Sequence, residues 1–221
     1  MKTFQTRLSL ISKDRFLRND EKYQEMVVQS ADNLSSTSTE NNVPLSEVLQ
    51  EEYTDFPYED DQVYKGIPTG QAYIDEDGDI VDYQPVTVEN HPGRLKYAVK
   101  NDNILLSSLR LAKSPALMFD DMDLSEYVFS NGFYIFKVRD GWKSRFVLHL
   151  LRSNRIKRLI DNNLFRGIGI SSYRVEDLLK CEVRRISIEA QNDAVKRIEQ
   201  IETKIRLLKK TTVKPQQIID S

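Results

Sequence analysis

The chain has 221 residues, of which 30% are charged and 39% hydrophobic, and its formal net charge is −2. This length is enough for one globular domain with an appended arm. No run approaches the roughly 18 apolar residues of a membrane-spanning helix, and the first residues do not form a secretory signal, so we expect a cytoplasmic protein. The single cysteine, Cys181, excludes an intrachain disulfide and a cysteine-based zinc site, and we interpret it as a buried structural thiol.

The charge is unevenly distributed along the chain. Residues 1–100 carry 10 Lys and Arg against 19 Asp and Glu, whereas residues 101–221 carry 22 against 15. The basic excess is concentrated in residues 137–185, with 13 basic and 5 acidic side chains. Such a surface suits a polyanion, but a solvated helix surface has the same composition, so charge alone leaves both interpretations open.

The composition divides the chain into four segments. Residues 1–42 contain a short N-terminal element and then a polar linker at 29–42, rich in Ser, Thr and Asn and without apolar periodicity. Residues 43–188 alternate short β-like runs with turns and helical spacing. A helix at 189–212 and a tail at 213–221 follow. We therefore expect one mixed domain with a helical arm.

An acidic turn lies near the start of the mixed segment. Asp77-Gly78 separates two alternating runs within residues 72–83, which is the strongest short-range signal for a β-hairpin. Asp75, Asp77 and Asp79 also have the spacing of an EF-hand calcium loop. The loop positions that require Gly and a bidentate Glu hold Ile and Val instead. We therefore predict a hairpin and no metal ion.

Further apolar runs predict strands at 97–99, 104–107 and 132–138. Residues 144–163 change to helical spacing, with a broad apolar face and arginines elsewhere. Strands and helices do not alternate in a regular βαβ rhythm. The sequence therefore predicts an α+β fold.

The C-terminal arm is a predicted coiled-coil helix. Residues 189–211 contain neither Gly nor Pro, and apolar side chains repeat there at 4-3-4-3 spacing, the a/d seam of a coiled coil. A single helix in water would leave this seam exposed, so we predict a subunit interface. Its residues are Ala194, Ile198, Ile201, Ile205 and Leu208.

Two short motifs are similar to those of DNA amino-methyltransferases. Phe165–Gly169 has the F-x-G-x-G form of an adenosyl-cofactor loop, and Asp55–Tyr58 differs by one residue from the D-P-P-Y pattern that grips a flipped base. A cofactor loop must follow a buried strand and begin a helix, whereas an amphipathic basic helix precedes Phe165. The acidic neighbours of Asp55–Tyr58 would repel DNA phosphates. A methyltransferase is therefore the remote alternative.

Signatures of other chemistries are missing from the sequence. It contains no G-x-x-x-x-G-K-[ST] phosphate loop, no G-x-S-x-G nucleophile elbow and no H-E-x-x-H zinc helix. Neither histidine has a motif that links it to Cys181. The sequence therefore favours a binding protein without a cofactor over an enzyme.

Three stretches carry a family resemblance: YAVKNDNILLSSLR at 97–110, VFSNGFYIFKV at 128–138, and the helix, glycine turn and short element at 145–187. In this order and spacing they resemble the target recognition domain of specificity subunits of Type I restriction-modification enzymes. The resemblance covers roughly residues 43–211. The chain departs from the family pattern at 186–191, where the usual prolines are replaced and Glu189-Ala190-Gln191 breaks the usual Glu-Gln pair.

The resemblance implies a non-catalytic subunit that reads a DNA sequence. Specificity subunits usually contain two recognition domains alternating with two spacer helices, whereas this chain has one of each, so it resembles a half-length subunit. Implied partners are double-stranded DNA, methyltransferase subunits that hold the adenosyl cofactor, in some complexes a restriction subunit, and a second copy or another half-subunit joined through the C-terminal helix.

Candidate DNA contacts are charged and polar side chains in or beside turns of the recognition domain. Basic side chains fix the register on the phosphate backbone, and polar side chains read base edges. The candidates are Lys65, Arg94, Lys96, Ser107, Arg110, Lys113, Asn131, Lys143 and Arg166, with Gln71 in addition.

A second class of function stays open. The chain could be a coiled-coil adaptor without DNA specificity, in which the helix is the functional element and the mixed domain binds an acidic protein. DNA affinity distinguishes the two classes, because a phosphate-binding protein loses affinity steeply with salt and a specific one keeps its sequence preference.

The first prediction concerns the glycine turn. Titration calorimetry with S-adenosylmethionine should detect no binding to the isolated chain, because Phe165–Gly169 lacks the strand that such a loop requires. Saturable micromolar binding that Gly167→Val abolishes would restore the methyltransferase interpretation.

Overall fold

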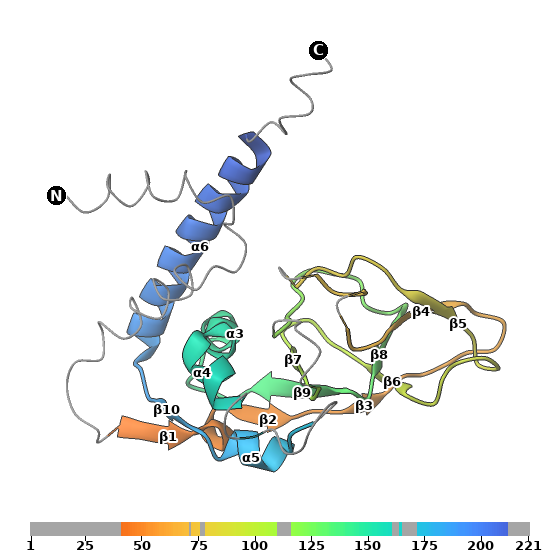
Figure 1. Ribbon diagram of the computed structural model, residues 1–221, viewed down its shortest axis with the longest axis horizontal. Helices are drawn as coiled ribbons and strands as arrows, with labels where there is room; N and C mark the ends of the chain where they lie inside the picture. Colours follow the sequence, from red (N-terminus) through yellow and green to blue (C-terminus); the bar gives the residue numbers. More distant parts are fainter. Residues whose placement is uncertain are drawn as a thin grey trace.

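Two sheets form the middle of the molecule in the computed structural model (Figure 1). Helix α6 (Ile188–Thr211) projects from one end, and strands β4 (Tyr64–Ile67) and β5 (Gln84–Val86) lie at the other. The structure describes residues 41–70, 72–75, 78–109, 116–160, 164 and 172–211.

Strand β9 (Phe133–Val138) is the centre of a three-stranded antiparallel sheet. It pairs with β2 (Leu49–Glu51) on one side and with β7 (Ile104–Ser107) on the other. Alternate side chains of a strand point to opposite faces, and here Phe136 and Ile135 belong to two different hydrophobic cores. The sheet is therefore buried on both faces around β9.

The second sheet has five strands in the order β3-β6-β8-β4-β5. Its remaining strands are β3 (Thr54–Asp55), β6 (Leu95–Ala98) and β8 (Tyr127–Ser130). All neighbours are antiparallel except β4 and β8, which run parallel. Ile67 and Phe129 of this sheet share a core with Leu105 and Phe133 of the first sheet. The two sheets therefore pack against each other through this core.

The opposite face of the five-stranded sheet is covered by the stretch that is similar to a D-P-P-Y motif. The rings of Phe56, Tyr58 and Tyr64 pack edge to face, with centroids 4.8–5.5 Å apart. The Tyr58 hydroxyl donates a hydrogen bond to the carbonyl of Leu95 at 3.1 Å. Asp55–Tyr58 thus forms part of a small hydrophobic core.

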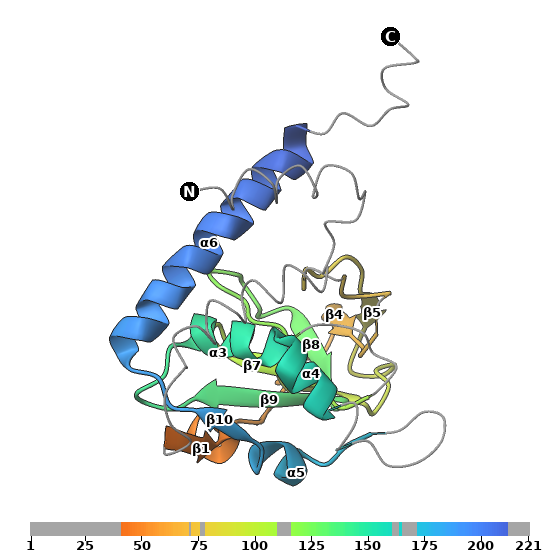
Figure 2. The ribbon, with the colours of Figure 1, turned by 60° about the vertical axis from the view of Figure 1, so that its left-hand side comes forward.

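Two helices cover the three-stranded sheet (Figure 2). The sequence predicted helical structure over 144–163, and the described part of this stretch is divided into two helices, α3 (Ser144–Arg152) and α4 (Asn154–Leu159). Ser153 breaks the helix with extended backbone angles, and its Oγ accepts a hydrogen bond from Ile156 N at 3.4 Å. A serine that caps a new helix in this way competes with continuation of the old one.

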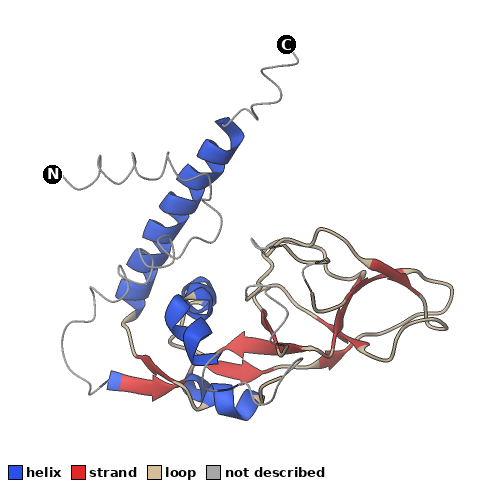
Figure 3. Cartoon of the chain, in the orientation of Figure 1, coloured by secondary structure: helices blue, strands red, loops and turns tan. Residues whose placement is uncertain are grey.

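Short elements beside the helices complete the hydrophobic core that contains Phe136, which we call the main core. The mixture of strands and helices confirms the expected α+β class (Figure 3). These elements are β1 (Asn42–Pro44), the 3₁₀ helix η2 (Leu45–Glu47), α5 (Val175–Leu179) and β10 (Glu182–Arg184). Strand β1 pairs with β10, so the first described residues lie against the segment that leads into α6.

The acidic turn has the expected hairpin form over its described residues. Ile74 and Ile80 form an antiparallel bridge. The Asp75 carboxylate accepts hydrogen bonds from the backbone N–H of Gly78 and of Asp79, both at 2.9 Å, while Asp77 lies outside the described residues. In the described part of the chain, no group of three His, Cys, Asp or Glu residues could hold a metal ion.

Helix α6 begins one residue earlier than predicted and is otherwise the expected arm. Ala194 and Ile198 are buried, Ile201 and Ile205 are half-buried, and the side chain of Leu208 lies outside the described part. The first half of the apolar seam is therefore already covered, and pairing with a second helix stays a prediction for the second half. No helix among the described residues is long and apolar enough to cross a membrane.

The packing at Gly66 in β4 generates a stability prediction. A Cβ there would lie 2.5 Å from Leu95 Cδ1 and 3.1 Å from the Gln84 carbonyl oxygen. Gly66→Ala should therefore lower the free energy of unfolding by about 1–3 kcal/mol. Gly93→Ala is the matched control, because nothing lies within 4 Å of its Cβ. Urea denaturation that gives equal stabilities for the two variants would contradict the packing described here.

Candidate nucleic-acid interface

Three chain connections meet at one edge of the two sheets. Strand β7 ends at Ser107, β8 turns into β9 through Asn131-Gly132, and Thr69 follows β4 closely. Ser108 donates both its backbone N–H and its hydroxyl to the carbonyl of Gly132, at 2.9 Å each. A Cβ on Gly132 would lie 2.9 Å from Thr69 Cγ2, so these turns are in direct contact.

The segment that precedes α5 joins the same edge. Ser172 forms a β-bridge with Leu109. The Tyr173 hydroxyl donates to the Ser107 carbonyl at 3.0 Å, and the Tyr134 hydroxyl of β9 donates to the Tyr173 carbonyl. Burial raises the pKa of both tyrosines, so both hydroxyls stay protonated donors. We call this surface the loop edge: Thr69, Arg94, Ser107–Leu109, Asn131–Gly132 and Ser172–Tyr173.

Two of the sequence-predicted contacts lie next to each other at the loop edge. The Asn131 backbone N–H donates to the Arg94 carbonyl at 2.7 Å, which joins the turn before β6 to the turn between β8 and β9. Both residues are exposed. A guanidinium is suited to phosphate or guanine, and a side-chain amide is suited to a base edge. The loop edge thus exposes one group of each kind.

Four further candidates lie outside the described residues, but the chain fixes where their segments attach. Arg110 directly follows Leu109, and the segment that contains Arg166 returns to the described structure at Ser172. Leu109 and Ser172 are bridged to each other at the loop edge. The four are Gln71, Arg110, Lys113 and Arg166.

Ser107 has a defined local role. Only 7% of its surface is exposed, and its Oγ accepts a hydrogen bond from Leu109 N at 3.1 Å. Its carbonyl accepts the Tyr173 hydroxyl. Ser107 therefore shapes the turn at the end of β7, and its direct contact with DNA stays a prediction.

Lys65 and Lys96 are already engaged within the chain. Lys65 Nζ lies 2.8 Å from a Glu126 carboxylate oxygen and 5.0 Å from the centre of the Tyr127 ring. The hydrogen bond that Lys65 donates to Glu126 raises the pKa of Lys65. Lys96 Nζ lies 3.5 Å from an Asp55 oxygen. Either lysine would have to exchange these partners for a phosphate, and their DNA contacts stay predictions.

Lys143 lies away from the loop edge. It is exposed and immediately precedes α3, after the turn at the far end of β9. Strand β9 spans about 17 Å at 3.3 Å per residue, so Lys143 and Asn131 lie near opposite ends of this strand. If both touch DNA, they touch different parts of it.

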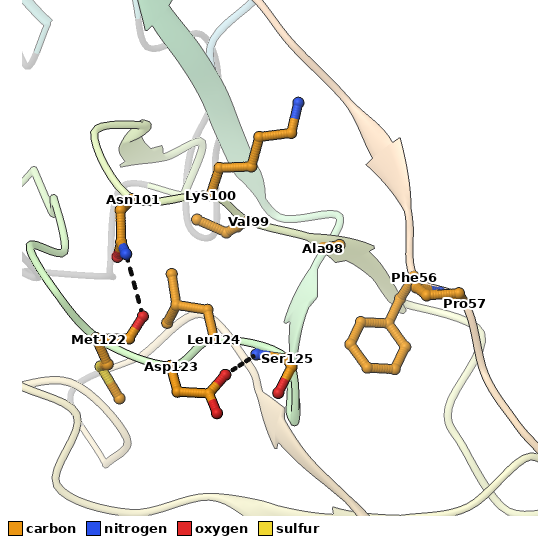
Figure 4. Close-up of a pocket in the computed structure, with 10 residues that line it drawn as sticks. All are labelled: Phe56, Pro57, Ala98, Val99, Lys100, Asn101, Met122, Asp123, Leu124 and Ser125. Carbon is orange, nitrogen blue, oxygen red and sulfur yellow. Dashed lines mark hydrogen bonds between the residues drawn. The ribbon is translucent and has the colours of Figure 1, made fainter.

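A shallow cavity of about 360 Å³ lies beside β6 (Figure 4). Its polar groups are used within the turns that line it: Asn101 Nδ2 donates to the Met122 carbonyl at 3.2 Å, and Ser125 N donates to an Asp123 oxygen at 3.0 Å. Figure 4 shows Phe56 and Pro57 on the opposite wall. The drawn groups do not converge on a common point, so the cavity is not the candidate site.

Sequence reasoning missed the residues that organise the loop edge. Tyr134 and Tyr173 lie far apart in the sequence, and neither belongs to a motif that indicates their contact. The Gly132–Thr69 approach is likewise non-local. The S-N-G sequence at 130–132 could have indicated this close approach, because a glycine in a turn allows another segment to pass close to the backbone.

The fold of this chain is similar to that of solved structures from Type I restriction-modification systems. The chain aligns with the HsdS subunit from Thermoanaerobacter tengcongensis at a TM-score of 0.62 and 20% identity, over 76% of this chain and 43% of that chain. A chain from a structural study of complex assembly and conformational transition of the type I R-M system aligns at a TM-score of 0.62 and 19% identity, with the same coverages. The resemblance seen in the sequence is therefore confirmed as a likeness of fold.

This chain spans less than half the length of either of those two proteins. No protein-family model matches the chain, and no curated protein matches its sequence.

The tyrosine contacts generate a prediction for the loop edge. Tyr134→Phe removes the hydrogen bond to the Tyr173 carbonyl, which should cost about 0.5–1.5 kcal/mol. Hydrogen exchange should speed up at the amide of Tyr173, which donates to the Ser108 carbonyl. Tyr83→Phe is the control, because it changes an exposed tyrosine elsewhere. Equal exchange rates in the two variants would show that Tyr134 does not hold this segment.

Proposed function

We propose that this chain is a non-catalytic DNA sequence-recognition subunit, a half-length relative of Type I specificity subunits. The observation that carries the proposal is the loop edge, where exposed Arg94 and Asn131 meet the attachment points of the segments with Arg110 and Arg166. The likeness of fold to an HsdS subunit supports it.

In this proposal the loop edge lies along one DNA half-site. Arginine and lysine side chains bind phosphates and fix the register, while Asn131 and neighbouring polar groups read base edges in a groove. Most of the candidate contacts are connected to two rigid sheets. The DNA therefore meets a preorganised frame at the loop edge.

The chain itself would carry out no chemistry. Methyltransferase subunits would supply the adenosyl cofactor and flip the target base, and a restriction subunit would join in a cleaving complex. Helix α6 would set the distance to a second half-site, which a second copy or another half-subunit supplies. This division of labour agrees with the absence of catalytic motifs from the sequence.

The next prediction distinguishes side chains that contact DNA phosphates from side chains that read base edges. Arg94→Ala should weaken binding to all sequences and reduce the slope of log affinity against log salt by about 0.9 per lost phosphate contact. Asn131→Ala should reduce discrimination at one base pair by about 1–3 kcal/mol. Arg110→Ala and Arg166→Ala should each show one of these two patterns. Fluorescence anisotropy over several salt concentrations measures both.

Lys180→Ala is the control for this series, because Lys180 is highly exposed and pairs with Asp177 next to α5. It should bind like the parent. If the parent binds no duplex with sequence preference, the adaptor interpretation replaces the proposal. If the Arg94, Asn131, Arg110 and Arg166 variants all bind like the parent, DNA uses another surface.

The assembly prediction uses the half-buried part of the α6 seam. Ile201→Glu combined with Ile205→Glu should abolish self-association or docking to a methyltransferase subunit, because each buried isoleucine contributes about 1.5–3 kcal/mol. Light scattering measures assembly, and circular dichroism measures folding. A folded monomer is expected. An unfolded chain would instead assign the seam to packing within the chain, and an unchanged oligomer would contradict both roles.

A further inference from the structure

Gln191 is a buried polar side chain in the first turns of α6. It has no exposed surface, although glutamine is mostly found on protein surfaces. It lies in the stripe of α6 that faces the domain, followed by Ala194 of the main core and by buried Ile198. A side chain of this kind needs partners for its amide group.

The partners lie on both sides of the junction between domain and helix. Gln191 Nε2 donates to the carbonyls of Gly141 at 3.1 Å and of Ile186 at 2.9 Å, and its Oε1 accepts from the backbone N–H of Lys143 at 2.8 Å. Gly141 and Lys143 belong to the turn between β9 and α3. Both amide hydrogens are used, so the side chain is held in one orientation.

We propose that Gln191 is a positioning residue that fixes the direction of α6 relative to the recognition domain. This inference deepens the proposed function and rests on it for its consequence on DNA. The apolar contacts of Ala194 and Ile198 are non-directional and tolerate a helix that tilts. Three hydrogen bonds to backbone groups do not tolerate a tilt, because their strength falls steeply with distance and angle.

The next polar contact along α6 is too long to replace Gln191. His149 Nε2 of α3 lies 3.8 Å from a Glu202 carboxylate oxygen, beyond hydrogen-bond length, and has no hydrogen-bond partner among the described residues. Burial and the nearby Arg152 and Arg145 lower the pKa of His149 to about 3, so it faces Glu202 as a neutral ring. Among the contacts described for α6, the hydrogen bonds that restrict its direction therefore lie at its base.

A small rotation at the base is amplified along the helix. The 24 residues of α6 span about 36 Å. A tilt of about 10° moves the far end by about 6 Å, nearly two base pairs at 3.4 Å each. If α6 joins two half-sites, Gln191 decides which spacing between them the protein accepts.

Double electron–electron resonance between two spin labels tests the positioning role of Gln191 without DNA. Spin labels are attached at Lys204→Cys on α6 and Lys137→Cys on β9, both exposed positions, in a Cys181→Ser background. The doubly labelled chain with Gln191 should give one narrow distance distribution. Gln191→Leu should broaden it at least two-fold or move its mean by about 5 Å or more. Gln200→Leu, the same change at an exposed position of the same helix, should leave it unchanged.

A second variant guards against misfolding. Gln191→Met has nearly the size and shape of glutamine, carries no charge and loses all three hydrogen bonds, so it should fold and give the same change in the distance distribution as Gln191→Leu. An unchanged distribution in Gln191→Leu would overturn the proposal. Unfolding of both variants would also overturn it, because Gln191 would then be a stability residue.

Selection from a duplex library with variable spacing tests the consequence. The full-length parent should select two half-site sequences at one spacing, and Gln191→Leu should select the same half-sites at spacings that vary by one or two base pairs. A variant that keeps the single spacing would overturn the role in spacing. A parent that selects no sequence would instead refute the proposed function. The distance measurement would still decide whether Gln191 fixes the direction of α6.

Discussion

The pairing of β9 with β2 and β7 is the constraint on which the rest of the structure depends. Its alternate side chains enter two cores, so the strand cannot shift by one residue without exchanging its buried faces. Its first residue follows the Asn131-Gly132 turn of the loop edge, and its last precedes the turn that Gln191 holds. One strand of fixed register therefore connects the candidate DNA surface to the base of the α6 arm.

Buried hydrogen bonds define both ends of this strand. At the loop edge the Tyr173 hydroxyl and Ser108 bond to backbone carbonyls, and at the other end Gln191 does the same. An unpaired buried polar group costs about 1–3 kcal/mol, so alternative arrangements of these turns are disfavoured. Apolar packing alone would bring the segments together without fixing their directions. Recognition of a base sequence at a defined spacing needs fixed directions.

The sequence predicted local elements well and their relations poorly. The run at 104–107 coincides with β7, and α6 differs by one residue, because uninterrupted apolar periodicity dominates there. Helical structure over 144–163 was predicted, but the break at Ser153 was not, because the apolar periodicity continues across the residue that caps α4. Arg94 was proposed as a charged residue beside a turn, and Asn131 as a polar loop residue. The contact between them was not predicted, because the turn between β8 and β9 and the turn before β6 meet only in the folded five-stranded sheet. The buried hydrogen bonds of Gln191 were not predicted, since a glutamine in an amphipathic helix is usually solvated.

Site-specific photo-cross-linking tests the central claim most directly. Asn131→p-benzoylphenylalanine places a reactive ketone at the loop edge. Asn42→p-benzoylphenylalanine places the same group at an exposed position of β1, a strand that lies toward the opposite end of the two sheets (Figure 1). After irradiation with the preferred duplex, the account predicts a covalent protein–DNA adduct from position 131 that excess unlabelled specific duplex suppresses, and no adduct from position 42. Cross-linking from position 42 without cross-linking from position 131 would contradict it.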